Sequence, residues 1–115
     1  MDLVNLYVDD LRKCPDGFII ARSYYEAIEI LNTRKINILS LDHDLGIGEN
    51  GIEKNGYDVV KYMCENGISP NKVYIHTDNV VGRDNMYYTL IGARERGFIG
   101  DNVEVYIYGY TENKI

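Results

Sequence analysis

Three short polar segments hold most of the side chains in this sequence that can do chemistry. The segments are Asp9-Asp10, Asp42-His43-Asp44 and His76-Thr77-Asp78-Asn79, and each follows a short apolar run. Both histidines of the chain lie in these segments. Carboxylate oxygens are the ligands that Mg²⁺ or Mn²⁺ prefers, and imidazole transfers protons near neutral pH. The residue types therefore favour a divalent metal site at Asp9, Asp10 and Asp42, with His43 and His76 beside it.

Apolar runs with strand character alternate along the chain with amphipathic runs of helical spacing. The apolar runs predict strands at 3–8, 18–21, 36–41, 73–76 and 103–108. The amphipathic runs predict helices at 24–34, 57–66 and 83–96, the first of which opens with a capping box at Ser23 and Glu26. The glycine-rich segment 43–56 lacks the spacing of a phosphate-binding loop, and we interpret it as a mobile flap.

This alternation predicts an α/β fold with an open, five-stranded parallel sheet and right-handed crossovers. The carboxyl ends of parallel strands meet at one edge of the sheet, which is where such sheets bind their ligands. The three polar segments follow the first, third and fourth predicted strands. We therefore expect their side chains to converge at this edge.

Length and charge exclude several classes of protein. The chain of 115 residues fits a single domain, which we take to span residues 1–115. Its net charge of -6 opposes binding to duplex DNA or to an anionic membrane. No apolar run is long enough to span a membrane and no basic leader precedes one, so we expect a cytoplasmic protein. Cys14 and Cys64 stand in unrelated contexts and are expected to be reduced thiols that bind no metal.

The residues around the start of the third predicted helix favour phosphate binding. Thr77, Asn79 and Arg83 can donate hydrogen bonds to a phosphate oxygen there, because backbone N–H groups at a helix start also attract anions. Each assignment has a structural alternative. Asn79 can instead cap the helix, the aspartates can cap helices or loops, and a single histidine at a strand end is more often structural.

The strand ends LYVDD, ILSLD and VYIHT resemble, in order, those of the receiver domain of two-component signalling. The resemblance implies that the receiver's acidic pair, phosphate-accepting aspartate and hydroxyl residue correspond to Asp9, Asp10, Asp42 and Thr77. The chain also departs from a receiver. Residues 9–17 are too few for the first receiver helix, we expect no last receiver helix after the fifth strand, and Tyr108-Gly109-Tyr110 replaces the receiver's lysine.

Three longer motifs resemble a divergent family, the cyclic-phosphate processing receiver domain. They are VDDLRKCPDGFIIARSYYEAI, SLDHDLG with a later NGYDVV, and IHTDNVVGRDNM. The resemblance implies a receiver-like sheet of strand order 2-1-3-4-5 that lacks the first and last helices. It also implies processing of cyclic nucleotide or RNA-terminal phosphates, in RNA repair or in conflict between phages and bacteria.

These observations lead to one main functional hypothesis and two alternatives. The main hypothesis is a metal-assisted phosphoesterase that acts on 2′,3′-cyclic phosphates, with a divalent metal on Asp9, Asp10 and Asp42 and with His43 and His76 as acid and base in an unassigned order. Asp42 can alternatively accept the phosphate covalently. The third hypothesis is a receiver-like module without catalytic activity that binds a phosphate ligand or a protein partner.

Side chains alternate along the predicted strands, with aliphatic residues on one face and tyrosines on the other. The tyrosine face comprises Tyr7, Tyr74, Tyr106 and Tyr108. We expect the aliphatic face to pack on the helices and the tyrosine face to form a homodimer interface. The alternative is that the loop at 11–17 and the C-terminal tail cover the tyrosines.

Overall fold

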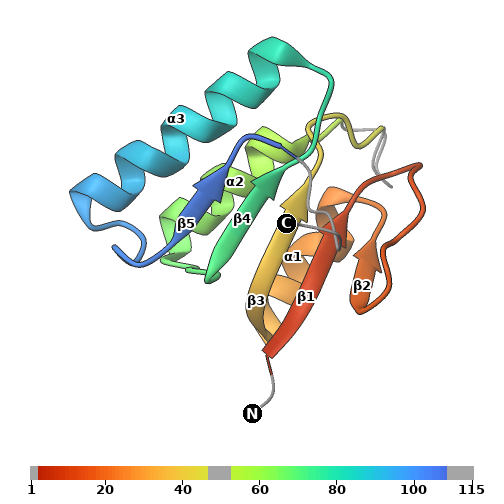
Figure 1. Ribbon diagram of the computed structural model, residues 1–115, viewed down its shortest axis with the longest axis horizontal. Coiled ribbons are helices and arrows are strands. Elements are labelled where there is room, and N and C mark those ends of the chain that lie inside the picture. The colour runs from red at the N-terminus through yellow and green to blue at the C-terminus, as the bar shows by residue number, and fades with distance from the viewer. Residues whose placement is uncertain (1–2, 47–52, 109–115) are drawn as a thin grey trace, which may run out of the picture.

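Five parallel strands and three helices alternate along residues 3–46 and 53–108, which are the residues that the computed structural model describes (Figure 1). The strands are β1 (Leu3–Val8), β2 (Phe18–Ala21), β3 (Lys35–Leu41), β4 (Lys72–Ile75) and β5 (Glu104–Tyr106). The helices are α1 (Tyr24–Thr33), α2 (Gly56–Asn66) and α3 (Val80–Arg96). The strands pair in the order β2-β1-β3-β4-β5. The predicted α/β class, parallel sheet and strand order 2-1-3-4-5 are confirmed.

The connection from β1 to β2 contains no helix, as the short segment 9–17 predicts. The segment after Tyr108, where a last receiver helix would stand, lies outside the described residues. The flap predicted at 43–56 lies partly outside them as well. No helix in the described part of the chain is long and apolar enough to cross a membrane.

Two predicted elements differ from the structure by more than one residue at one end. Helix α3 begins at Val80 rather than at residue 83, because the side chain of Asn79 accepts a hydrogen bond from the N–H of Gly82 and caps the helix earlier. Strand β5 is shorter than the predicted 103–108, because its ladder with β4 ends at the pair of Tyr74 and Tyr106.

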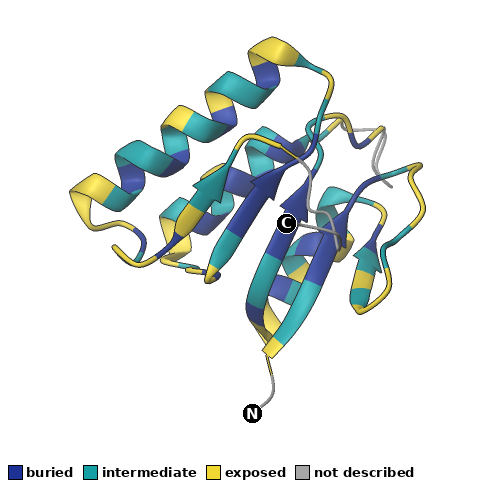
Figure 2. Cartoon of the chain, viewed as in Figure 1, coloured by how far each residue is buried: buried dark blue, intermediate teal, exposed yellow. Residues whose placement is uncertain are grey.

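One hydrophobic core joins the sheet to all three helices. Its fully buried members include Leu6, Leu39 and Val73 from the inner strands, Val60 from α2 and Leu90 from α3. Figure 2 shows the dark blue of buried residues along β1, β3 and β4, the inner strands of the sheet. The predicted packing of the aliphatic strand face on the helices is confirmed.

The opposite face of the sheet carries the tyrosines. The strand register aligns Tyr7, Ser40, Tyr74 and Tyr106 in one row across β1, β3, β4 and β5. The rings of Tyr74 and Tyr106 stack with their centroids 4.8 Å apart. Tyr7 and Tyr74 are buried, Tyr106 is half-buried, and Tyr108 is 51% exposed. The C-terminal tail that was predicted as an alternative cover lies outside the described residues.

The homodimer through the tyrosine face stays a prediction that sedimentation tests. Because Tyr7 and Tyr74 are already buried in a single chain, a second subunit would contact the end of the face at Tyr106 and Tyr108. If this face is a dimer interface, the wild type is a dimer at micromolar concentration and Tyr106→Glu is a monomer, since the variant would bury a carboxylate in the interface. A monomeric wild type would contradict the dimer, and a dimeric variant would place the interface elsewhere.

Candidate functional site

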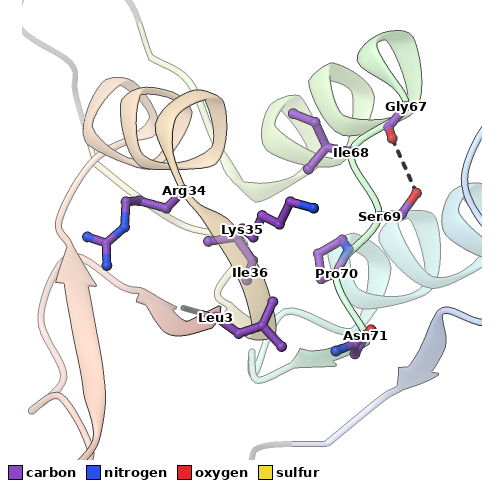
Figure 3. A pocket seen from close by; sticks show the side chains of 9 residues that line it. All are labelled: Leu3, Arg34, Lys35, Ile36, Gly67, Ile68, Ser69, Pro70 and Asn71. Carbon is purple, nitrogen blue, oxygen red and sulfur yellow. Dashed lines mark hydrogen bonds between the residues drawn. The ribbon is translucent and has the colours of Figure 1, made fainter. Parts of the chain in front are cut away.

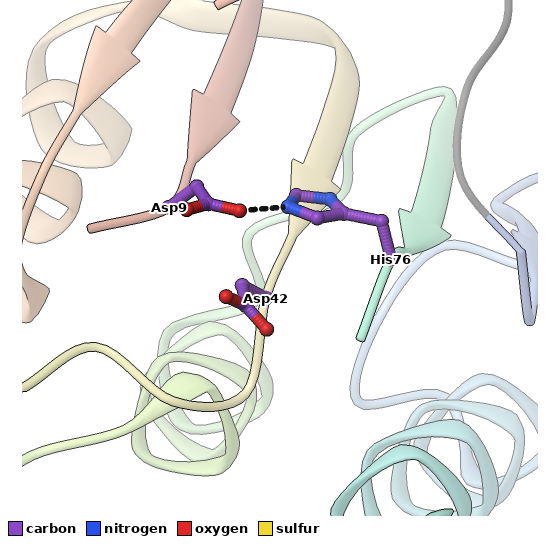
Figure 4. Close-up of side chains that lie close together, drawn as sticks. All are labelled: Asp9, Asp42 and His76. Atoms are coloured by element: carbon purple, nitrogen blue, oxygen red, sulfur yellow. Dashed lines mark hydrogen bonds and ion pairs between the residues drawn. The ribbon is translucent and has the colours of Figure 1, made fainter. Parts of the chain in front are cut away.

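Three polar residues stand side by side where the inner strands end. The hydrogen-bond ladder of the sheet continues one residue beyond the strands, from the N–H of Asp42 to the carbonyl of Val8 and from the N–H of His76 to the carbonyl of Leu41, both at 3.0 Å. This continuation places Asp9, Asp42 and His76 next to one another. A carboxylate oxygen of each aspartate and a ring nitrogen of the histidine all lie within 4.8 Å of one another (Figure 4).

Asp9 is a buried carboxylate with three hydrogen-bond donors. Its Oδ1 accepts the backbone N–H groups of Leu11 and Arg12, both at 2.8 Å, and its Oδ2 accepts from Nε2 of His76 at 2.9 Å. Burial by itself would raise the pKa of Asp9, but these hydrogen bonds outweigh it and hold the pKa below its usual value. Asp9 is therefore ionised at neutral pH.

His76 is held by both of its ring nitrogens. A carboxylate can only accept, so Nε2 carries the proton that it donates to Asp9, and Nδ1 accepts from the hydroxyl of Ser40 at 2.7 Å. The ring stacks on Tyr7 with a centroid distance of 4.5 Å. Burial lowers the pKa of His76 in spite of the opposing hydrogen bond to Asp9. At neutral pH the pair is thus a neutral imidazole that donates to a carboxylate, and His76 fixes the position of Asp9.

Asp42 has fewer donors than Asp9. Its Oδ1 accepts the backbone N–H of the next residue, His43, at 2.7 Å. Burial and the nearby charge of Asp9 raise the pKa of Asp42, although hydrogen bonding from Thr77 opposes the shift. A second carboxylate beside an ionised one is an unfavourable arrangement that a cation would relieve. The carboxylate oxygens of Asp9 and Asp42, which lie next to the ring of His76, therefore suit a divalent metal ion.

A cavity of about 250 Å³ opens beside these side chains. Its lining comprises Asp9, Asp10, Leu11, Arg12, Asp42, Asp44, Thr77 and Asp78. The predicted site residues Asp9, Asp10, Asp42 and Thr77 thus share one cavity. Arg12 is the only cation in this lining. An anionic ligand here needs that guanidinium, a metal ion, or both.

The other four predicted site residues lie outside this lining: His76, which lines a neighbouring cavity, and His43, Asn79 and Arg83. His43 turns toward the start of α3, where Nδ1 lies 2.9 Å from a carboxylate oxygen of Asp44 and 3.3 Å from the amide nitrogen of Asn79. Asn79 caps α3, and Arg83 pairs with its neighbour Asp84 at 3.4 Å. The ring of His43 contacts the cavity lining through Asp44, and its backbone N–H donates to the cavity residue Asp42.

Arg12 is a site residue that the sequence analysis missed. One of its guanidinium nitrogens, Nη1, donates to the backbone carbonyl of His76 at 3.0 Å, and Nη2 lies 3.2 Å from the carboxylate of Asp78. Its Nε lies 3.9 Å from Oδ2 of Asp9. The signal that could have identified Arg12 was charge, because this basic residue follows two aspartates at an edge of the sheet that is rich in carboxylates.

A larger cavity lies at the opposite, amino edge of the sheet and carries no comparable chemistry. It measures about 510 Å³ and contains two cationic residues, Arg34 and Lys35. Figure 3 shows that these two side chains extend in different directions, so they do not converge on one ligand. Size alone therefore does not identify the functional site of this protein.

Helix α2 approaches the site so closely that its first residue must be glycine. The N–H of Gly56 donates to the carbonyl of His43 at 2.7 Å, and a Cβ on Gly56 would overlap the carbonyl oxygen of Asp42. We expect Gly56→Ala to lower the free energy of unfolding by about 1–3 kcal/mol, because a backbone atom must move. Urea denaturation measures this loss.

Gly92→Ala is the matched control for that measurement. Gly92 lies within α3, and a Cβ there would meet only the mobile end of Arg96, at 3.3 Å. Alanine forms helix better than glycine, so this variant is expected to gain up to about 1 kcal/mol. Equal effects of the two substitutions would contradict the close approach at Gly56.

The chain matches the profile of a known protein family over most of its length. The profile of the cyclic-phosphate processing receiver domain matches residues 4–92, from β1 into α3, a range that includes Asp9, Asp42 and His76. No curated protein and no solved structure matches the chain. The family match and the parallel sheet of order 2-1-3-4-5 lead to one assignment. The chain belongs to the cyclic-phosphate processing receiver domain family.

Proposed function

We propose that this protein is a metal-assisted phosphoesterase that opens 2′,3′-cyclic phosphates of nucleotides or RNA ends. The observation that carries the proposal is the meeting of Asp9, Asp42 and His76 within 4.8 Å beside a cavity at the carboxyl edge of the sheet. Membership of the family supports a cyclic phosphate as the substrate class.

Asp9 and Asp42 are the residues that would hold Mg²⁺ or Mn²⁺, and Asp10 in the same cavity is a further candidate ligand. Such an ion supplies Lewis-acid polarisation of the phosphoryl oxygens. The role of His76 in this arrangement is to hold Asp9 in place, because both ring nitrogens are engaged by Asp9 and Ser40.

The protein's own residues can move the two protons that ring opening requires. One proton leaves the attacking water and the other reaches the ribose oxygen whose bond to phosphorus breaks. A carboxylate oxygen of Asp42 that does not bind the metal can take the proton of the water, because Asp42 lines the cavity. His43 lies outside the cavity lining but contacts the cavity residue Asp44, so it is the candidate that supplies the proton of the ribose oxygen through that carboxyl group. Thr77 and Arg12 can hydrogen-bond the remaining phosphoryl oxygens.

A substrate screen tests the proposal. Cyclic and linear nucleotide phosphates are incubated with the protein and with Mg²⁺, Mn²⁺ or a chelator, and products are separated by chromatography. We expect conversion of 2′,3′-cyclic phosphates that requires metal, that Asp9→Asn slows by about 10²-fold or more, and that the exposed control Asp101→Asn retains. Conversion that is equal in both variants would contradict the site.

A further inference from the structure

A second cavity adjoins the carboxylate cavity. It measures about 200 Å³ and shares three lining residues with the first, Arg12, Thr77 and Asp78. Its remaining lining residues are Ile75, His76, Ile107 and Tyr108. Small-molecule sites usually occupy about 300–1,000 Å³, and neither cavity alone reaches this range. A ligand as large as a nucleotide would need both cavities.

The ion pair of Arg12 and Asp78 lies at the boundary between the two cavities. The carboxylate of Asp78 is fully solvated, with its side chain 99% exposed, and the side chain of Arg12 is 44% exposed. Exposed ion pairs contribute little to stability, so an incoming phosphate can replace Asp78 at small cost. The hydrogen bond from Nη1 to the carbonyl of His76 keeps the guanidinium at the boundary during this exchange.

The linings differ in charge. The first cavity holds five aspartates around one arginine, which suits a phosphate only together with a cation. Asp78 is the only aspartate of the second cavity, whose lining is mostly polar but includes Ile107 and Tyr108, which are 45% and 51% exposed. An uncharged nucleoside fits this lining, because its base can stack on the exposed tyrosine ring while its ribose hydroxyls meet the polar groups.

We propose that the second cavity is a subsite for the nucleoside of a terminal nucleotide, that Tyr108 provides its stacking surface, and that Arg12 binds the phosphate at the boundary. This inference rests on the proposed function for the phosphate in the first cavity. The homodimer predicted through the tyrosine face would cover Tyr108, so the two proposals exclude each other at this residue.

A binding experiment tests the subsite without requiring turnover. Calorimetry in the presence of Mg²⁺ compares adenosine 3′-monophosphate with inorganic phosphate, for the wild type, Tyr108→Ala and the control Tyr88→Ala on the exposed side of α3. We expect the wild type to bind the nucleotide about tenfold or more tightly than phosphate, and Tyr108→Ala to lose this preference. Tyr88→Ala is expected to keep the preference, and Arg12→Ala is expected to weaken the binding of both the nucleotide and inorganic phosphate.

Two results would overturn the subsite: a wild type with no preference for the nucleotide, or a preference that Tyr108→Ala retains. A turnover assay distinguishes failure of the subsite from failure of the proposed phosphoesterase function. Ethylene phosphate is a five-membered cyclic phosphate without a nucleoside. If Tyr108→Ala opens ethylene phosphate like the wild type but has lost its preference for nucleotides, both proposals stand. If nucleotide preference depends on Tyr108 but no cyclic phosphate is opened, the subsite stands and the phosphoesterase fails.

Discussion

Replacing Asp42 with asparagine is expected to lower the turnover of cyclic phosphates by about 10²-fold or more. Asparagine keeps the size of the side chain and can still accept the N–H of His43, so the fold is expected to remain. What the variant loses is the negative charge beside Asp9 and the basic oxygen that can accept a proton. Steady-state turnover of a 2′,3′-cyclic nucleotide measures the loss, with Asp101→Asn as the surface control.

The dependence of this loss on metal concentration separates the possible roles of Asp42. If Asp42 is only a ligand, added metal restores part of the activity. No recovery at saturating metal would indicate a role as base or as covalent phosphate acceptor, and a phosphoryl adduct in the intact mass of the acid-quenched wild type would identify the covalent role. Unchanged turnover in Asp42→Asn would remove Asp42 from the mechanism.

The raised pKa of Asp42 also sets the direction of a pH effect on metal binding. A carboxyl group with a raised pKa keeps its proton to a higher pH than an ordinary aspartate does, and a metal ion must displace that proton. Metal affinity of the wild type should therefore fall as the pH is lowered, beginning above the pH at which ordinary aspartates titrate. Calorimetric titration with Mn²⁺ at several pH values measures this.

Replacing His76 with alanine is expected to lower the free energy of unfolding by about 2–4 kcal/mol. The substitution leaves Oδ2 of the buried Asp9 and the hydroxyl of the buried Ser40 without their partner, and it removes the ring that stacks on Tyr7. Urea denaturation at neutral pH measures the loss. His43→Ala is the comparison, because the carboxylate that its ring contacts, Asp44, is 70% exposed, so the substitution leaves no buried carboxylate without a donor and a smaller loss is expected.

The same pair of variants tests the protonation state of His76. Its pKa is lowered in the folded protein, so below pH of about 6.5 the unfolded chain takes up a proton that the folded chain rejects. The free energy of unfolding of the wild type should therefore fall as the pH is lowered from about 7.5 toward 5.5. The full loss is about 1.4 kcal/mol for each unit by which folding lowers the pKa of His76. His76→Ala should lack this component. If the free energy of unfolding changes with pH by the same amount in the wild type and in His76→Ala, the assignment of a neutral, buried imidazole is contradicted.

The sequence predicted the framework of the site because that framework depends on strand order alone. Asp9, Asp42 and His76 each follow an inner strand of a parallel sheet, and such strands end at one edge whatever the packing around them. The sequence also predicted the tyrosine face, because successive side chains of a strand point to opposite faces of the sheet.

The orientation of individual side chains needed tertiary contacts that no local pattern contains. His43 follows Asp42 directly but packs over Gly82 on α3, where a Cβ would overlap its ring. Arg83 was expected to bind phosphate at the start of a helix, yet α3 begins earlier and Arg83 pairs with Asp84. Arg12 belongs to an irregular segment, so no periodicity could direct it to the site.

The most direct test of the central claim is a ³¹P magnetic resonance measurement on adenosine 2′,3′-cyclic phosphate mixed with the protein and Mg²⁺ or Mn²⁺. The account predicts that the resonance of the cyclic ester is replaced by that of a monophosphate ester, that a chelator stops the conversion, and that Asp9→Asn and Asp42→Asn are both slowed by about 10²-fold or more. A cyclic ester that persists with every metal, while the nucleotide still binds, would contradict it and would identify a binding module instead.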